Sequence, residues 1–174
     1  MQTLQEINDA VTKTPKGWHH TYLTDYYENL FSKFRNEKFN ILEIGIDKGQ
    51  SLDLWSLYFP NAVIYGMDKA NNNYQPSNSR IKVIYGSSTN KQSFSGLPNF
   101  KFIIDDGSHK LQNQLATFWN AWSFLEQDGY YIIEDIKDID SSRNEFEKLN
   151  TNCKIFDLRS KKNIYDSVIV EIQK

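Results

Sequence analysis

Five short apolar runs, each bounded by turn residues, constrain the fold of this chain more than any other feature of its sequence. They are rich in β-branched and aromatic residues and lie at residues 39–44, 62–67, 81–85, 100–104 and 130–133. Runs of this length and composition are typical of buried strands. Helical patterns separate them: apolar residues recur every three or four positions from Leu111 to Leu125, and residues 51–58 form a shorter pattern. Strands that alternate with helices predict a doubly wound, mostly parallel α/β sheet with helices on both faces.

The two ends of the chain complete this prediction. After a polar helical stretch at residues 141–149, two further apolar runs at 154–158 and 167–172 are separated only by a charged turn. Strands joined this closely predict an antiparallel hairpin at one edge of a seven-stranded, Rossmann-like sheet. Residues 1–38 carry aromatic and leucine side chains at helical intervals, so we expect a helical lid over the carboxyl edge of the sheet. The chain of 174 residues suits one domain, with this lid and a core at 39–174.

Charge and composition exclude several classes of function. The formal net charge is −2 and the lysines are dispersed, so the sequence carries no basic footprint for nucleic acid. No stretch approaches the roughly 20 apolar residues that a membrane span needs. Residues 1–14 lack the pattern of an export signal, and the single Cys153 has no partner for a disulfide. We therefore expect a cytoplasmic protein that acts on a small molecule or glycan.

The turn after the first predicted strand resembles a nucleoside site. It reads Glu43-Ile-Gly45-Ile-Asp-Lys-Gly49 and lies where open α/β sheets bind ligands. The spacing is not that of the dinucleotide fingerprint, whose turn cradles a pyrophosphate, so a nucleoside without phosphates suits it better. Asp68 ends the second predicted strand, 25 residues beyond Glu43, where a carboxylate can accept hydrogen bonds from both ribose hydroxyls. The alternative is a plain strand-to-helix turn followed by a surface Asp.

Acidic side chains and a histidine follow the next two predicted strands. The fourth strand ends at Asp105-Asp106-Gly-Ser-His109, and the fifth ends at Glu134-Asp135. In the expected strand order these ends are neighbours, so the carboxylates converge in one crevice, and a bound cation would offset their charge. Oxygen ligands favour Mg²⁺, or another divalent cation such as Mn²⁺ or Ca²⁺, over zinc. His109 could act as general base for a hydroxyl bound there. Taken singly, each group could instead be a turn or a polar strand end.

Together these motifs resemble a known enzyme family. The glycine turn followed by Tyr-Gly-Met-Asp68 is similar to the first two motifs of the class I S-adenosylmethionine-dependent methyltransferases. The sequences Asp-Asp-Gly-Ser-His109 and Glu134-Asp135 resemble those of metal-dependent sugar and macrolide-sugar O-methyltransferases of the mycinamicin and tylosin tailoring type. The resemblance extends over nearly the whole chain.

The resemblance implies roles for particular residues. Asp106, Glu134 and Asp135 would bind the metal, with His109 as the base and Asp106 beside it in catalysis. The cofactor, S-adenosyl-L-methionine, would be bound by Glu43, Gly45, Ile46, Gly49, Ser51, Asp68, Lys69, Ser87, Ser88 and Asp105. Two motifs depart from the family pattern: Gly-Ser87-Ser88-Thr replaces a frequent Asp and Gln near the adenine, and Thr-Pro-Lys16 replaces Thr-Asp-Lys. Roles for Lys16, His20 and Tyr22 stay open.

The sequence therefore predicts a methyltransferase that moves a methyl group to a hydroxyl of a sugar, in a polysaccharide or a glycosylated metabolite. Two alternatives stay open: an enzyme for another hydroxylated acceptor such as a catechol, and a protein that binds or cleaves the cofactor without transfer. A second subunit of a homo-oligomer could help to form the acceptor pocket. A nicotinamide-dependent oxidoreductase is disfavoured because the dinucleotide spacing is missing.

Overall fold

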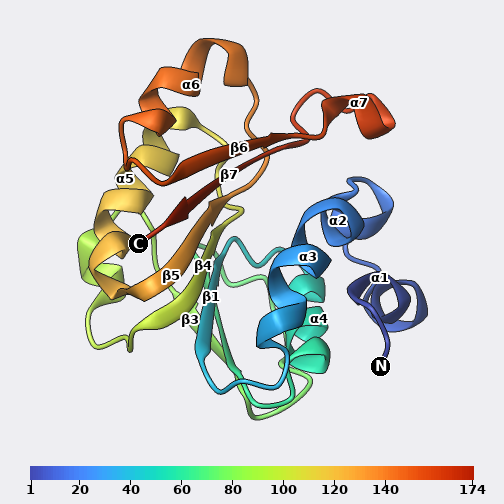
Figure 1. Cartoon of the computed structure of the whole chain (residues 1–174). Helices are drawn as coiled ribbons and strands as arrows, with labels where there is room; N and C mark the ends of the chain where they lie inside the picture. Colours follow the sequence, from blue (N-terminus) through green and yellow to red (C-terminus); the bar gives the residue numbers. More distant parts are fainter.

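A seven-stranded sheet runs through the middle of the molecule (Figure 1). It is described by a computed structural model of residues 1–174, and its strand order is β3-β2-β1-β4-β5-β7-β6. The strands are β1 (Asn40–Ile44), β2 (Val63–Asp68), β3 (Ile81–Tyr85), β4 (Phe100–Asp105), β5 (Leu125–Ile133), β6 (Cys153–Asp157) and β7 (Val168–Gln173). The first five are parallel, and β7 is antiparallel to both β5 and β6. The predicted doubly wound sheet with an antiparallel C-terminal hairpin is confirmed.

Helices cover both faces of this sheet, and each face has its own core (Figure 1). On one face lie α4 (Gln50–Tyr58) and the N-terminal segment, while α5 (Leu111–Ala121) and α6 (Ile139–Glu147) lie on the other. The strands serve both cores because successive side chains point to opposite faces. In β4, for example, Phe102 belongs to the first core and Ile103 to the second. This burial on both faces explains the continuous apolar runs of the sequence.

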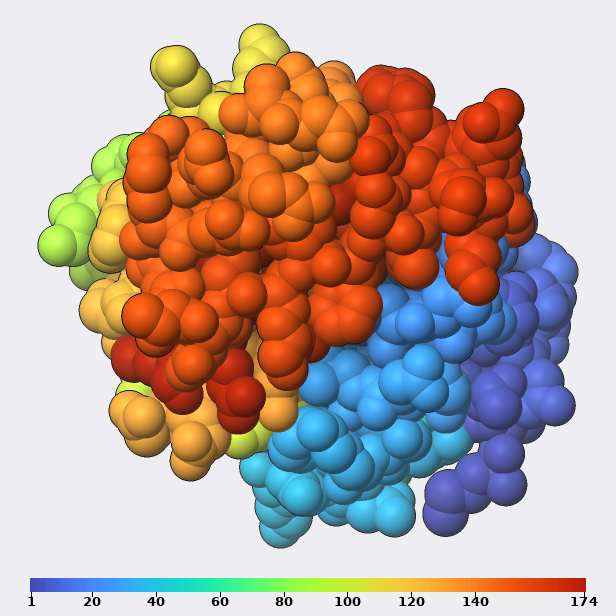
Figure 2. All heavy atoms as spheres, turned by 45° about the horizontal axis from the view of Figure 1, so that its top comes forward, coloured from blue at the N-terminus to red at the C-terminus, as the bar shows by residue number.

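The N-terminal segment is more broken than the one or two helices that we expected. It consists of α1 (Leu4–Ile7), a π-helical turn η1 (Asn8–Thr12), α2 (Pro15–Trp18), a second π-helical turn η2 (Leu23–Tyr27), α3 (Glu28–Phe31) and a 3-10 turn η3 (Ser32–Phe34). Much of it belongs to the core, since Tyr22, Tyr27 and Phe31 are fully buried. The segment around α2 reaches the carboxyl edge of the sheet and contacts α7 (Arg159–Lys162), because the Lys162 ammonium donates hydrogen bonds to the carbonyls of Gly17, Trp18 and His20. Figure 2 shows this contact on the surface, where the red segment that includes α7 lies against the blue N-terminal segment.

One predicted boundary was wrong. The helical pattern that we extended to Leu125 ends earlier, because α5 stops at Ala121 and a 3-10 turn, η5 (Trp122–Phe124), follows. Leu125 already belongs to β5, where it pairs with Phe100, and the strand register then shifts before Tyr130 pairs with Phe102. Asp128, with a left-handed φ of 62°, lies within this irregularity. No helix combines the length and the apolar character needed to cross a bilayer.

Candidate active site

A cavity of about 670 Å³ opens at the carboxyl ends of the parallel strands. Backbone hydrogen bonds continue the sheet by one residue beyond each strand, from Gly45 to Met67, from Asp106 to Ile44 and from Glu134 to Asp105. The residues after β1, β4 and β5 are thereby held side by side. The cavity wall also includes the turns after β2 and β3, together with residues 14–16 and His20 of the N-terminal segment.

At one end of the cavity, Asp68 presents its carboxylate beside the turn after β1. Its Oδ2 accepts a hydrogen bond from the Ile46 N–H at 2.9 Å, and its Oδ1 accepts one from the Ala70 N–H at 3.0 Å. Burial alone would raise the pKa of Asp68, but hydrogen bonds from the backbone N–H groups of Ala70 and Ile46 hold the pKa below its ordinary value. The side chain is therefore an ionised acceptor at the cavity wall.

Most of the residues predicted to bind the cofactor line this cavity. The structure brings together Gly45, Ile46, Ser51, Asp68, Lys69, Ser87 and Ser88. Glu43 lies behind the wall instead: it is fully buried and accepts hydrogen bonds from Ser51 Oγ at 2.8 Å and Trp55 Nε1 at 2.6 Å. Its role in the structure is to fix the start of α4 against β1.

The two glycines of the turn are needed for contacts within the protein. Gly45 has a φ of 95°, and a Cβ there would lie 2.1 Å from the carbonyl oxygen of Asp106. Gly49, with a φ of 76°, lies against the ring of Tyr74 and does not line the cavity. Gly45 lines the cavity as well, so its predicted contact with the cofactor stays a prediction, whereas Gly49 lies one step behind the wall. Gly45 also lets the turns after β1 and β4 approach each other.

Asp105 also lies behind the cavity wall. Its carboxylate is buried, and its Oδ1 accepts a hydrogen bond from the Gly107 N–H at 3.3 Å. Burial raises the pKa of Asp105 to about 7. Its Oδ2 and the hydroxyl of Tyr131 are both buried without a hydrogen-bond partner. The predicted cofactor contact by Asp105 therefore has no support in the geometry, and the side chain instead braces the loop that carries Asp106.

At the other end of the cavity, Asp106, His109 and Asp135 form a cluster. One ligand atom from each lies within 4.8 Å of the others. His109 Nε2 is 3.0 Å from Asp106 Oδ1 and 3.8 Å from Asp135 Oδ2. The hydrogen bond to Asp106 raises the pKa of His109 to about 9. The neighbouring carboxylates thus stabilise the protonated ring, whereas the predicted general base needs the neutral one.

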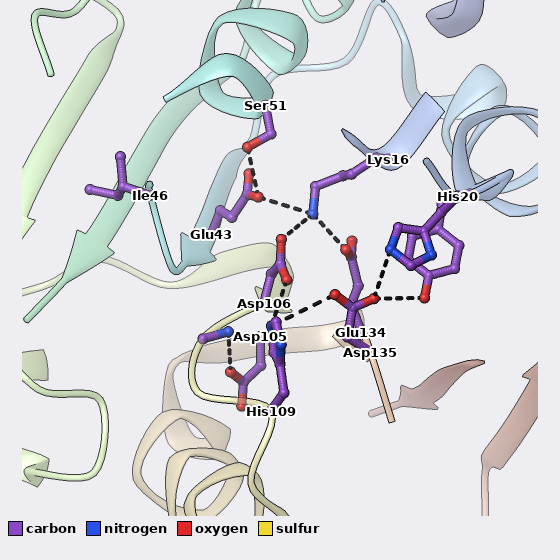
Figure 3. A network of polar contacts seen from close by, with 12 residues as sticks. Lys16, His20, Glu43, Ile46, Ser51, Asp105, Asp106, His109, Glu134 and Asp135 are labelled. Atoms are coloured by element: carbon purple, nitrogen blue, oxygen red, sulfur yellow. Dashed lines mark hydrogen bonds and ion pairs between the residues drawn. The ribbon is translucent and has the colours of Figure 1, made fainter. Parts of the chain in front are cut away.

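Glu134 lies next to this cluster but has different partners. It is 1 % exposed, and its carboxylate accepts hydrogen bonds from the Tyr27 hydroxyl and from Lys16 Nζ, the latter at 2.5 Å. Burial raises the pKa of Glu134 to about 8 even with Lys16 beside it, and burial together with the charge of Asp106 raises the pKa of Asp135 to about 6. Of the three predicted metal ligands, Asp106 and Asp135 share the cluster, and Glu134 adjoins it through Lys16 (Figure 3).

The N-terminal segment supplies the residues whose roles sequence reasoning left open. Besides Glu134, the Lys16 ammonium also donates to Asp106 Oδ2, at 2.6 Å. The Tyr22 hydroxyl donates to Asp135 Oδ1 at 2.8 Å, and His20 Nε2 lies 3.6 Å from the same oxygen. These residues lie between Lys16 and Tyr27, where the helical pattern of the sequence does not show which side chains reach the cavity, so the only signal for them was the family resemblance.

The chain is similar in sequence to known O-methyltransferases. No family model matches the chain. The chain is 31% identical over 134 residues to the 8-demethyl-8-(2-methoxy-alpha-L-rhamnosyl)-tetracenomycin-C 3'-O-methyltransferase of Streptomyces olivaceus, a match that covers 68% of this chain and 33% of that protein. It is 28% identical over 144 residues to the demethylmacrocin O-methyltransferase of Streptomyces fradiae, covering 75% of this chain and 36% of the relative. The chain thus spans about a third of the length of these curated relatives.

Solved structures show the same fold. The MycE methyltransferase from the mycinamycin biosynthetic pathway, in complex with Mg, SAH and mycinamycin VI, superposes with a TM-score of 0.76 at 22% identity, over 99% of this chain and 54% of that one. A fibrillarin pre-rRNA processing protein of Methanococcus jannaschii has a TM-score of 0.64 at 19% identity, over 79% of this chain and 67% of the other. The chain is therefore similar in sequence to the sugar O-methyltransferases of macrolide and polyketide pathways, and its fold is that of the Rossmann-like methyltransferases.

Proposed function

We propose that this chain is an S-adenosylmethionine-dependent O-methyltransferase that uses a divalent metal and methylates a hydroxyl of a sugar. One observation carries the proposal: a single cavity has the ionised Asp68 at one end and the cluster of Asp106, His109 and Asp135 at the other. A nucleoside and a hydroxyl acceptor could therefore occupy adjoining parts of the same cavity. The acceptor class is supported by the tetracenomycin relative, whose name places a rhamnosyl group in its substrate.

The residues present fit a hard divalent cation. Asp106 and Asp135 offer carboxylate oxygens, which Mg²⁺ and Mn²⁺ prefer. Burial and neighbouring carboxylates raise the pKa values of Asp135 and Glu134 even though the Lys16 ammonium lies beside them. The one ammonium therefore does not compensate the negative charge of these carboxylates when they are ionised. We propose Asp106, Glu134 and Asp135 as the ligands, as the sequence predicts. A cation bound there would lower the pKa of a coordinated hydroxyl.

The chain's own residues would then orient the substrates and move one proton. Asp68 would accept hydrogen bonds from the ribose hydroxyls of the methyl donor. The imidazole of His109, held by Asp106 at 3.0 Å, would accept the proton of the acceptor hydroxyl as its oxygen attacks the methyl group. His109 needs its neutral form for this step, and charge neutralisation of Asp106 and Asp135 by a cation would lower its pKa toward that form.

Calorimetry and a transfer assay test this proposal. S-adenosylmethionine should bind to the chain, and labelled methyl groups should reach sugar-bearing acceptors in the presence of Mg²⁺. Transfer to catechols alone would favour the first alternative acceptor class, and cofactor breakdown without any methylated product would favour a cofactor-cleaving protein. No binding of S-adenosylmethionine would refute the proposed function. The sequence also predicts a cytoplasmic location and no nucleic-acid or membrane partner, and these stay predictions. The sequence leaves open whether the chain forms a homo-oligomer.

A further inference from the structure

Lys16 occupies the centre of the acidic end of the cavity. It lies in α2 (Pro15–Trp18) and is 3 % exposed. Its ammonium is 2.5 Å from Glu134 Oε2, 2.6 Å from Asp106 Oδ2 and 3.3 Å from Glu43 Oε1 (Figure 3). A buried ammonium this close to three carboxylates neutralises part of their charge. The chain therefore places a cation of its own between two of the carboxylates that the proposed metal needs.

The remaining oxygens of these two carboxylates are also engaged. Asp106 Oδ1 contacts His109 Nε2, and Glu134 Oε1 accepts a hydrogen bond from the Tyr27 hydroxyl. A divalent cation that bound both Asp106 and Glu134 would need oxygens that Lys16 now holds. An ammonium and a divalent cation against the same oxygens repel each other, so metal binding disfavours the present position of the ammonium.

Glu43 offers a place for the ammonium to move to. Its Oε1 is the most distant of the three partners of Lys16 and belongs to a carboxylate that does not line the cavity. Ser51 and Trp55 hold Glu43 in place from the side of α4. A lysine has a flexible stem and a compact charge, so a short shift toward Glu43 keeps it paired while it releases the other two carboxylates.

We propose that Lys16 is the resident counter-cation of the metal site: it competes with the divalent cation for Asp106 and Glu134, and Glu43 is the carboxylate to which it withdraws. The inference rests on the proposed function. It makes Lys16 a determinant of metal affinity, and it couples the N-terminal segment to metal occupancy through a charged side chain.

Mn²⁺ binding, measured by the electron paramagnetic resonance signal of free Mn²⁺, tests the proposal without any transfer assay. Lys16→Met removes the competitor, so we expect Mn²⁺ to bind about tenfold more tightly than to the unmodified chain, a change of the size typical for neighbours of metal ligands. Lys16→Arg keeps the charge and should not tighten binding. Lys48→Met is the matched control: Lys48 lines the same cavity but makes no ion pair with these carboxylates, so its loss should leave the affinity unchanged.

A double-mutant cycle separates competition from a general effect of charge. Glu43→Gln removes the alternative partner, so Lys16 should hold Asp106 and Glu134 more firmly and Mn²⁺ should bind more weakly. In the Lys16→Met background the same change should have no effect. An equal effect of Glu43→Gln in both backgrounds, or a Lys16→Met variant that binds Mn²⁺ no more tightly, would overturn the proposal.

A measurement on the unmodified chain covers the case in which Lys16→Met does not fold. With lysines labelled at Cε, a Mg²⁺ titration followed by NMR should shift the Lys16 signal and leave the Lys48 signal in place. A stationary Lys16 signal while Mg²⁺ binds would refute the inference and leave the proposed function intact. If neither Mn²⁺ nor Mg²⁺ binds to the unmodified chain or to Lys16→Met, the proposed metal and this inference both fail.

Discussion

The two ends of the cavity are built in different ways. The end near Asp68 consists mainly of turns that directly follow parallel strands, and its main interactions are backbone N–H groups that donate to one carboxylate. The end near Asp106 depends on side chains from distant parts of the chain, since Lys16 contacts Asp106 and Glu134 across 90 and 118 residues of sequence. The first end is preformed by the sheet, whereas the second depends on how the N-terminal segment packs and on which cation is present.

Metal removal should affect the acidic end most. We expect chelation by EDTA, or the substitution Asp135→Asn, to reduce methyl transfer by about 10⁴-fold, because a metal that stabilises a developing alkoxide contributes several kcal/mol to the transition state. S-adenosylmethionine binding, measured by calorimetry, should persist in Asp135→Asn. Added Mg²⁺ should restore the chelated enzyme. Full activity in chelator would show that the acidic cluster works without a metal.

His109→Ala should have the next largest effect, a loss of about 10³-fold in kcat, since general-base catalysis contributes on the order of 10²- to 10⁴-fold. The measurement is single-turnover transfer from labelled cofactor. Lys48→Met is a suitable control, because Lys48 lines the same cavity but makes no ion pair with the acidic cluster. A His109→Ala variant that keeps most of its rate would leave proton removal to another group.

The comparison also shows how much the sequence could predict. Strand order, the antiparallel hairpin and the positions of Asp68, Asp106 and Asp135 follow from local patterns, because the carboxyl ends of parallel strands always meet at one edge. The partners of Glu134 do not follow from such patterns, because Lys16 and Tyr27 belong to a segment of short, interrupted helices. Nor did the pattern show that Asp105 and Glu43 lie behind the cavity wall, since successive side chains of a strand point to opposite faces and an acidic residue at a strand end can belong to either face.

Asp68→Asn should affect only the preformed end. A neutral amide accepts weaker hydrogen bonds from ribose hydroxyls than a carboxylate does, and hydrogen bonds to charged groups contribute about 1.5 to 3 kcal/mol. We therefore expect S-adenosylmethionine to bind about 10- to 100-fold more weakly, while Mn²⁺ affinity stays the same. Parallel calorimetry and Mn²⁺ titration check this. A loss of Mn²⁺ binding in Asp68→Asn would mean that the two ends are not independent.

Gly45→Ala should act through stability, because this glycine lies where the turns after β1 and β4 meet. The new Cβ would lie 2.1 Å from the Asp106 carbonyl oxygen in a residue with a φ of 95°, so the turns after β1 and β4 would have to separate. We expect a loss of about 2 to 3 kcal/mol in the free energy of unfolding, measured by urea denaturation. Gly96→Ala is the matched control: Gly96 has a φ of 77° but no atom within 4 Å of an added Cβ, so this change should cost only the backbone strain, about 1 kcal/mol. Equal losses in the two variants would show that the contact between Gly45 and Asp106 does not hold the two ends of the cavity together.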